Sequence, residues 1–414
     1  MRSCRSRPSR SCQAPWWQSS CTRATDVFRS TKRTFLTQID DMTHIYLDYN
    51  ASTPIDPAVA NAMRPLLPEA FGNPSSGHWA SVPAKVALDR ARAQVATLIG
   101  AAPDEIVFTS GGSEANNLAL KGTVLASSNA GGHVITQSTE HPAILKPLQF
   151  LERLGTKVTC VPVDGNGRVD PDAIRRAITP RTTLITVMHA NNETGTIQPI
   201  EDIGTIAREH GIRFHTDAAQ SIGKIPADVD ALGVDLLSIA GHKLYAPKGI
   251  GALYVRKGVG LEPLIHGAGH ENGRRAGTES ALLAAGFGEA CALARDLAAM
   301  DGIRALRDRL WHALQDRFDD RVRLNGHLEY RLPNTVNVSF VGRVGTDVLA
   351  ALDGVAASTG SACHAGRMTL SPVLAAMGIA EQVGMGAIRF SLGRHTTADE
   401  IDTVIAKLSA IARG

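Results

Sequence analysis

The chain has 414 residues with 43% hydrophobic content, which is enough for two domains and a substantial buried core. Its 43 basic and 40 acidic side chains leave a formal charge of +3, so composition gives no reason to expect a nucleic acid or a membrane surface as the main partner. The sequence contains no apolar run of about 18 residues or more, which excludes a membrane-spanning helix. We expect a soluble, cytoplasmic protein.

The six cysteines do not suggest a disulfide framework. Three of them fall before residue 42, and the others, Cys160, Cys291 and Cys363, are far apart in the chain. Cysteines spread so thinly are typical of a reducing compartment, where a free thiol is either a small core residue or a reactive group.

Residues 1–41 contain seven arginines, one lysine and three aspartates, without helical or strand periodicity. An arginine- and serine-rich leader of this kind is typical of an organelle transit peptide. Trp16, Trp17 and the scattered cysteines and prolines make a poor amphipathic helix, however, which favours an upstream extension before a start at Met42. Both interpretations leave this segment out of the fold, and we expect order from His44 onward.

From residue 44, short apolar runs rich in β-branched residues alternate with helical stretches, a rhythm typical of a mostly parallel sheet with helices on both faces. The expected strands are Ile106 to Thr109, Val134 to Gln137, Lys157 to Val161, Thr183 to Met188, Arg213 to Thr216, Leu236 to Ile239 and Gly251 to Val255. Such sheets bind ligands at the carboxyl ends of their strands. Polar clusters follow several of these runs directly, so we expect them to meet in one crevice.

Beyond Gly277 the pattern changes. Residues Glu279 to Phe318 are rich in alanine, leucine and arginine at helical spacing, which predicts a long connector helix. The later elements are strands at Thr335 to Phe340, Val355 to Ser358 and Ala387 to Leu392, a helix near Thr346 to Leu352 and a closing helix from Ala398. We predict a leader over 1–41, a large domain over 44–277 whose N-terminal segment contributes to the small domain, and a connector with a small α+β domain over 278–414.

Lys243 is the first candidate for chemistry. It follows an apolar strand ending at Ile239, after a turn of small residues and His242. At the end of a buried strand the amine would be partly desolvated, which lowers its pKa and favours Schiff-base formation with an aldehyde. The alternative is an ordinary exposed loop lysine.

Asp217 closes another apolar strand, so we expect its carboxylate to be buried. A buried carboxylate needs a cationic partner, and a protonated pyridine nitrogen is one that also makes a cofactor a better electron sink. The alternative is an N-cap for a following helix. Three residues on, Gln220 is within reach of a phenolic oxygen of the same cofactor.

The segment Thr109 to Glu114 is a glycine-rich turn between a strand and a helix that opens near Ser113. Such a turn presents free N–H groups and the positive end of a helix dipole to a phosphate. It has neither the trailing Gly-Lys of a P-loop nor a Gly-x-Gly-x-x-Gly pattern, so we expect a single phosphate group rather than a nucleotide. Many ordinary loops share this composition.

Two further polar clusters follow strands. His141 lies in Ser138 to Pro142, where its imidazole would stack on a planar ring, move protons, or fill a structural role. Asn192 lies in Asn191 to Gly195, a turn by composition whose amides are able to hydrogen-bond a cofactor oxygen.

Cys363 lies in Ser358 to Gly366, a run of small polar residues with almost no apolar neighbours. This composition predicts a mobile loop rather than a core position, and mobility would let a thiol visit a buried substrate and leave again. His364 beside it is placed to help form the thiolate. Arg389 lies in the strand-like run Ile388 to Ser391, where a fixed guanidinium would bind an amino-acid carboxylate or form a structural ion pair.

Taken together, these motifs resemble those of the cysteine desulfurases. The segments that carry the resemblance, in order over about residues 44–412, are Tyr46 to Ala51, Gly72 to Ser76, Glu140-His141, Asn191 to Glu193, Asp217 to Gln220, Gly241 to Lys243, Arg275 to Thr278 and Gly360 to Cys363. The resemblance implies the α/β architecture of fold-type I transferases dependent on pyridoxal 5′-phosphate (PLP), in the class V aminotransferase group, with a mostly parallel seven-stranded sheet and a smaller α+β domain. It also implies a homodimer with active sites at the subunit interface.

By matching positions, the resemblance implies a set of residue roles. Lys243 would hold PLP as a Schiff base, and Cys363 would become the persulfide that carries the sulfur. The catalytic His141 would stack on the ring, Asp217 would pair with the pyridine nitrogen, and Gln220 would contact the phenolic oxygen. Gly112, Ser113 and His242 would bind the phosphate of PLP, and Thr278 would bind the phosphate of the PLP in the other subunit. Asn192 would contact both the cofactor and the substrate, and Arg389 would bind the substrate carboxylate. Cys363 would also be a transient iron–sulfur ligand through its persulfide.

Some positions distinguish this chain within the family pattern. Ala240 stands where the family usually has a phosphate-binding serine, and Ser113 replaces a frequent threonine while keeping the hydroxyl. Losing one phosphate contact is expected to weaken PLP retention by about 1 kcal/mol. The short loop around Cys363 resembles the group that passes sulfur to partner proteins, and the details at His266 to His270 are similar to the desulfurases serving DNA phosphorothioate modification.

The resemblance therefore predicts an enzyme that converts L-cysteine to L-alanine and leaves sulfur on Cys363 for acceptor or scaffold proteins, in iron–sulfur cluster assembly or in thio-modification of tRNA or DNA. We expect no direct contact with nucleic acid or membrane. The enzymatic alternative is a selenocysteine lyase or an aminotransferase of the same fold. The alternative of another class is a non-catalytic sulfur-relay scaffold.

Overall fold

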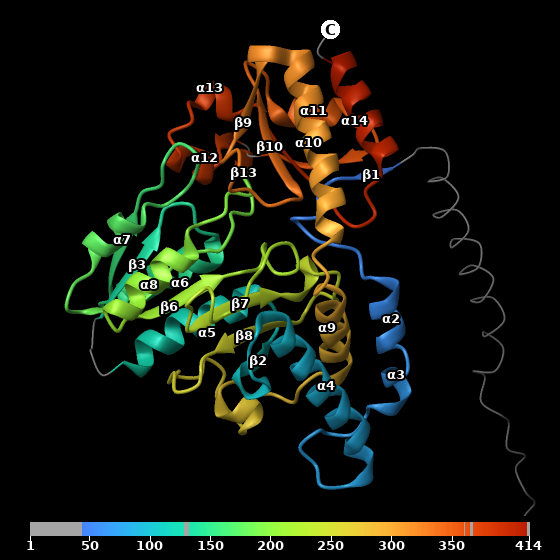
Figure 1. Ribbon diagram of the computed structural model, residues 1–414. Helices are drawn as coiled ribbons and strands as arrows, with labels where there is room; N and C mark the ends of the chain where they lie inside the picture. The colour runs from blue at the N-terminus through green and yellow to red at the C-terminus, as the bar shows by residue number, and fades with distance from the viewer. Residues whose placement is uncertain (1–43, 128–131, 360, 365–366, 412–414) are drawn as a thin grey trace, which may run out of the picture. The chain divides into compact units, whose positions relative to one another are not determined.

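Seven strands form one sheet in the computed structural model, which describes residues 44–127, 132–359, 361–364 and 367–411 (Figure 1). In spatial order they are β2 (Ile106–Thr109), β8 (Gly251–Val255), β7 (Leu236–Ala240), β6 (Arg213–Asp217), β5 (Thr182–Thr186), β3 (His133–Gln137) and β4 (Lys157–Val161). Strand β8 runs antiparallel to both neighbours, and the other pairings are parallel. The mostly parallel seven-stranded sheet expected from the sequence is confirmed.

Both faces of this sheet are apolar because alternate strand residues point to opposite sides. On one face, the strand residues Phe108, Ile185 and Phe214 pack with helix residues in the larger buried cluster. On the other face, Val107 and Leu184 pack with helix residues in two smaller clusters. The helices of this part are α2 (Pro57–Met63), α3 (Leu66–Glu69), α4 (Val82–Ile99), α5 (Gly112–Ala126), α6 (Pro142–Arg153), α7 (Pro171–Ala177), α8 (Ile200–Glu209) and α9 (Ala281–Leu293).

A second, four-stranded sheet is antiparallel throughout. Its order is β12 (Ser358–Thr359), β15 (Ala387–Ser391), β10 (Thr335–Phe340) and β9 (Val322–Asn325). It has its own apolar core, to which α10 (Ala299–Phe318) and α14 (Ala398–Ile411) contribute. The shorter helices are α11 (Gly345–Ala351), α12 (Pro372–Ala376) and α13 (Glu381–Gly384). The sequence did not predict β9.

Two predictions for this part need correction. The expected strand at Val355 to Ser358 is split, because β11 (Val355–Ala356) pairs with β1 (Ile45–Tyr46) while β12 joins the four-stranded sheet. The expected long connector is broken into α9 and α10, since Asp296 accepts the Ala298 N–H and turns the chain between them. The two helices then pack in different apolar clusters, α9 under the large sheet and α10 against the small one.

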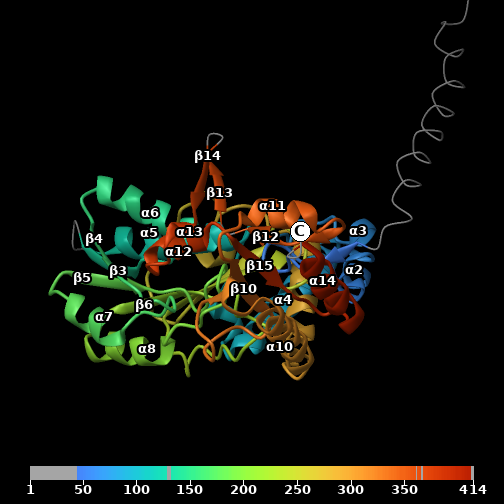
Figure 2. The ribbon, with the colours of Figure 1, turned by 90° about the horizontal axis from the view of Figure 1, so that it is seen from above.

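The segment of Cys363 is also different from the prediction. Residues Ser361–His364 form strand β13, which pairs antiparallel with β14 (Arg367–Leu370), so the loop prediction is wrong for these residues. Cys363 lies opposite Met368 in this register. Figure 2 shows the two strands standing out from the neighbouring elements. Gly360, Ala365 and Gly366, which were part of the same prediction, lie outside the described residues.

From Ile45 onward the chain forms one compact unit, and the predicted division after residue 277 stays a prediction. In the part of the chain that the structure describes, no helix has the length and apolarity needed to cross a membrane.

Gly251 gives a test of how tightly the sheet is packed beneath the turn at Gly111. A Cβ at Gly251 would lie 2.5 Å from the Ile239 carbonyl oxygen and 2.7 Å from the Gly111 Cα, both of them backbone atoms. We expect Gly251→Ala to lower the free energy of unfolding by about 1–3 kcal/mol, as overpacking does. A Cβ at Gly302, in α10, would have no atom within 4 Å. Because alanine favours a helix more than glycine does, Gly302→Ala is expected to raise the free energy of unfolding by about 0.5–1 kcal/mol. Urea unfolding of both variants checks the pair, and equal effects would contradict this packing.

Candidate active site

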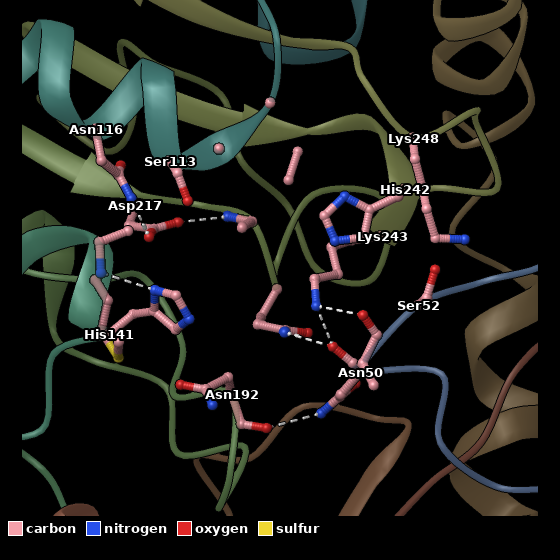
Figure 3. A pocket seen from close by; sticks show the side chains of 18 of the residues that line it. Asn50, Ser52, Ser113, Asn116, His141, Asn192, Asp217, His242, Lys243 and Lys248 are labelled. Carbon is pink, nitrogen blue, oxygen red and sulfur yellow. Dashed lines mark hydrogen bonds between the residues drawn. The ribbon is translucent and has the colours of Figure 1, made fainter.

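A cavity of about 650 Å³ lies at the carboxyl ends of β2, β3, β5, β6 and β7 (Figure 3). The segment after β1 and one residue of β15 complete its wall, so both sheets contribute. The predicted site residues that line it are Gly112, Ser113, His141, Asn192, Asp217, Gln220, His242, Lys243 and Arg389. The residues from Gly112 to Lys243 are brought together because the parallel strands of the large sheet end on one side, and Arg389 joins them from β15.

Lys243 ends the short 3-10 turn that follows β7, and its amine points across the cavity toward the segment after β1 (Figure 3). Its Nζ donates to the main-chain oxygens of Asn50 at 2.5 Å and Ala51 at 2.8 Å. Burial, together with the nearby Arg389, lowers the pKa of Lys243 to about 8. A substantial share of the amine is therefore neutral and nucleophilic near neutral pH.

Asp217 closes β6 on the other side of the cavity, as Figure 3 shows. Its Oδ2 accepts from Asn116 Nδ2 at 2.7 Å, and its Oδ1 accepts the Ala219 N–H at 3.0 Å. No described residue forms a salt bridge with this carboxylate, although Asp217 is only 7% exposed. The N-cap alternative is wrong, because the residues after Asp217 form turns rather than a helix.

His141 caps α6 and also lines the cavity. Its Nδ1 accepts the Ala143 N–H at 3.0 Å, so the proton of the neutral ring sits on Nε2. Burial lowers the pKa of His141, Lys243 acts in the same direction and Asp217 opposes them. The imidazole is therefore a neutral, flat group with one free N–H.

The N-terminus of α5 forms another side of the cavity, through Gly111, Gly112 and Ser113. The first N–H groups of a helix have no intrahelical partner and carry the positive end of its dipole. Gly111 adopts φ 146° and ψ −177°, a conformation open only to glycine, which lets the turn enter the helix here. His242 lies in the same wall, and burial with Lys243 lowers its pKa to about 4, so it donates as a neutral ring.

Arg389 enters from β15 and has more partners than the sequence suggested. Its Nη2 donates to Asp48 Oδ1 at 2.6 Å and to Ser358 Oγ at 3.0 Å, and its Nη1 donates to the Asn192 main-chain oxygen at 2.9 Å. The ion-pair alternative is confirmed by Asp48, and the binding of an amino-acid carboxylate by Arg389, which lines the cavity, stays a prediction.

Gln220 is oriented by two hydrogen bonds. Its Nε2 donates to the Asn50 main-chain oxygen at 3.0 Å, and its Oε1 accepts from Lys224 Nζ at 3.3 Å. Burial, with Lys243 and Arg389 nearby, lowers the pKa of Lys224 to about 7.

One predicted residue lies outside this cavity. Thr278 is exposed in the loop after Arg275 and borders a neighbouring hollow instead. Cys363 is on strand β13 of the β13–β14 hairpin, and the surroundings of its side chain lie outside what the structure describes. No described cluster of three or more histidine, cysteine or acidic side chains is arranged to hold a metal ion.

Sequence reasoning missed several residues that organise the site. Asn50 joins the parts of the site, because its side chain bonds Thr335 at 2.9 Å and Asn334 at 3.0 Å in addition to the bonds at its main-chain oxygen. Asn116 orients Asp217, and Asp48 pairs with Arg389. The available signal was the segment Tyr46 to Ala51, which carries part of the resemblance and contains both Asp48 and Asn50.

The donor set fits PLP. A lysine of lowered pKa suits its aldehyde, a buried carboxylate without a cationic partner suits its pyridinium nitrogen, and the free amides of α5 suit its phosphate. The cationic side chains at the cavity, which include Lys243, Lys248 and Arg389, also favour an anionic ligand.

Comparison with known proteins supports this chemistry. Residues 45–404 match the family model described as Aminotransferase class-V. "Cysteine desulfurase IscS" of Dictyoglomus turgidum is 48% identical over 373 residues, covering 89% of this chain and 94% of the relative. Among solved structures, one titled "NIFS-LIKE PROTEIN" matches with TM-score 0.84 and 36% identity over 89% of this chain and 99% of its own. Another, titled "SspA in complex with cysteine", matches with TM-score 0.77 and 40% identity over 85% of this chain and 100% of its own.

The chain belongs to the class-V aminotransferase family, whose members depend on PLP. Within that family it belongs with the cysteine desulfurases.

The pKa of Lys243 predicts how PLP attaches. Only the neutral amine attacks an aldehyde, so the rate at which cofactor-free protein acquires the absorbance of covalently bound PLP is expected to rise with pH up to about 8 and to level off above it. An ordinary lysine would keep the rate rising toward pH about 10.4. Stopped-flow absorbance between pH 6.5 and pH 10, roughly, separates the two profiles, and Lys243→Arg is the control that acquires no such absorbance at any pH.

Proposed function

We propose that this enzyme removes sulfur from L-cysteine with PLP attached to Lys243, releases L-alanine and retains the sulfur as a persulfide on Cys363. The observation that carries the proposal is the cavity itself, where a lysine of lowered pKa faces a buried carboxylate that has no cationic partner among the described residues. The desulfurase relatives, which cover almost the whole folded part of the chain, support the same assignment.

PLP, when bound, supplies an electron sink for negative charge that develops at the substrate α-carbon. The residues of this chain hold the cofactor in place. Asp217 would keep the pyridine nitrogen protonated, Gln220 would donate to the phenolic oxygen, and His141 would stack on the ring. Gly112, Ser113 and His242 would hold the phosphate, without the hydroxyl that the family usually has at the position of Ala240.

The substrate is held and deprotonated by neighbouring groups. Arg389 and Asn192 bind the carboxylate of L-cysteine, which places the α-carbon near Lys243. Lys243 would take the α-proton, and its pKa of about 8 suits a base that acts near neutral pH.

Cys363 completes the reaction. Its thiolate attacks the substrate sulfur, an S–S bond forms as the carbon–sulfur bond breaks, and the electron pair and a proton remain with the product as L-alanine. The persulfide then passes its outer sulfur to a thiol of an acceptor or scaffold protein. We assign the reaction to the cytoplasm, where thiols remain reduced.

We also propose that the enzyme is a homodimer. Large apolar side chains are exposed on α3, just after it, on the turn Trp79–Ser81 and on α4, including Leu67 (67% exposed), Phe71 (72%), Trp79 (79%) and Val86 (60%), and the rings of Phe71 and Trp79 contact edge to face. Soluble monomers rarely leave such a patch uncovered, and a second copy of the chain is the partner we assign to it. This arrangement would let the exposed Thr278 of one chain reach the phosphate of the other.

Replacing the sulfur acceptor tests the reaction. With Cys363→Ser we expect the absorbance of bound PLP to be retained and the formation of alanine and sulfide from L-cysteine to fall by a factor of about a thousand or more, because the nucleophile is lost. Cys160→Ser, at an exposed thiol of β4, is the control that keeps full turnover. Unchanged turnover in Cys363→Ser would remove this residue from the mechanism. Higher alanine yield from selenocysteine than from cysteine would favour a selenocysteine lyase.

Trp79→Glu tests the dimer. The charge is expected to shift the protein from twice the monomer mass to the monomer mass and to weaken PLP retention, because the phosphate loses its contact across the interface. Leu154→Glu is a matched control, since Leu154 is an exposed leucine (56%) at the end of α6 and outside the patch. Light scattering after size exclusion reads the mass. A monomeric parent protein, or a dimeric Trp79→Glu variant, would contradict the proposal.

A further inference from the structure

Arg389 is held by a closed set of hydrogen bonds. Asp48 and Ser358 both bond its Nη2, and Ser358 Oγ also donates to Asp48 Oδ1 at 2.9 Å, so the three side chains form a triangle. The Asn192 oxygen holds Nη1. The remaining guanidinium nitrogen, Nε, is buried without a hydrogen-bond partner among the described residues.

The backbone fixes all three corners of this triangle. Ser358 on β12 lies opposite Arg389 in the register of β12 and β15, and Asp48 forms an isolated bridge with Ser391 two residues further along β15. The side chains are also well covered, with 9% of Arg389 and 18% of Asp48 exposed. A long side chain with several rotatable bonds is therefore confined to one orientation before any ligand arrives.

Asp48 does not line the cavity, so it acts only through its partner. We propose that Asp48 is a positioning residue for amino-acid recognition: together with Ser358 it sets the orientation of the Arg389 guanidinium that receives the substrate carboxylate. This inference rests on the proposed function, in which Arg389 binds that carboxylate.

Asp48 has a second, electrostatic effect that gives an independent readout. Arg389 lowers the pKa of Lys243, whereas Asp48, which partly neutralises the arginine, raises it. Removing the charge of Asp48 therefore leaves the arginine less compensated, and the pH profile for covalent attachment of PLP moves to lower pH. This shift reads the charge of Asp48, whereas the change of KM reads its hydrogen bonds to Arg389.

The experiment compares Asp48→Asn with the parent holoenzyme. We expect KM for L-cysteine to rise about ten- to a hundredfold, as loss of a hydrogen bond to a charged group does, while kcat changes by less than about threefold and PLP is retained. Ser358→Ala is expected to change KM in the same direction by about three- to tenfold. Adding Asp48→Asn to Arg389→Lys is expected to raise KM no further, because the residue through which Asp48 acts is already gone.

Asp56→Asn is the matched control. Asp56 belongs to the same N-terminal segment, is 17% exposed, and pairs with Arg394 at 3.6 Å outside the cavity. Its KM and its PLP attachment profile are expected to equal those of the parent. Asparagine at position 56 still has a side-chain oxygen to accept the Ala58 N–H, so the cap of α2 is kept.

Two results would overturn the assignment of Asp48. One is a KM within about twofold of the parent value, and the other is an equal rise of KM in the parent and Arg389→Lys backgrounds. The dissociation constant for L-alanine, followed by the absorbance of bound PLP, gives the same comparison without turnover. A parent enzyme that binds L-alanine but releases no sulfur from L-cysteine would count against the proposed function alone.

Discussion

The buried carboxylate of Asp217 is the constraint around which the site is built. Leaving a carboxylate in a poorly hydrated place is costly unless hydrogen bonds and a cation stabilise it. Asn116 and the Ala219 N–H supply the hydrogen bonds, and no described residue supplies an ion-pair partner. The folded chain thus leaves one electrostatic requirement to be met by a ligand, and a pyridinium ring meets it. Placing Asp217 at the carboxyl end of β6 also puts it opposite Lys243, at the end of the adjacent β7.

The segment after β1 links this centre to the second sheet. Asn50 bonds the Lys243 amine and Gln220 through its main-chain oxygen, and its side chain reaches Asn334 and Thr335 next to β10. Asp48, two residues earlier, holds Arg389 of β15. One short strand segment therefore joins the groups assigned to the cofactor with the group assigned to the substrate, so the two binding functions share a common frame.

The sequence predicted the large sheet well, because its strands are continuous apolar runs bounded by turns, and burial on both faces leaves little freedom for other structures. The sequence-based prediction failed where local composition favours one structure and contacts with distant residues favour another. Residues Glu279 to Phe318 have helical composition throughout, but Asp296 and two separate apolar cores divide them. The small polar residues around Cys363 have a loop composition, yet main-chain pairing places Ser361–His364 in a strand.

For the site, many of the predicted residues stand at or after the ends of strands, where sequence order indicates which side of the sheet they share, whereas Arg389 lies within β15 and Thr278 in a loop outside the cavity. Asn50, Asn116 and Asp48 were not assigned roles, because their importance comes from partners distant in sequence. The pKa values of Lys243 and His242 likewise depend on burial and on charges from several elements. A single sequence therefore indicates the chemistry of the cavity but not the network that tunes it.

The most direct test of the central claim is to reduce the PLP-loaded protein with borohydride, digest it, and locate the modified lysine by mass spectrometry. The account predicts a pyridoxyl group on Lys243, with Asp217→Asn greatly reducing the amount bound. A label on Lys224 or Lys248, or a protein that acquires no label at all, would contradict it.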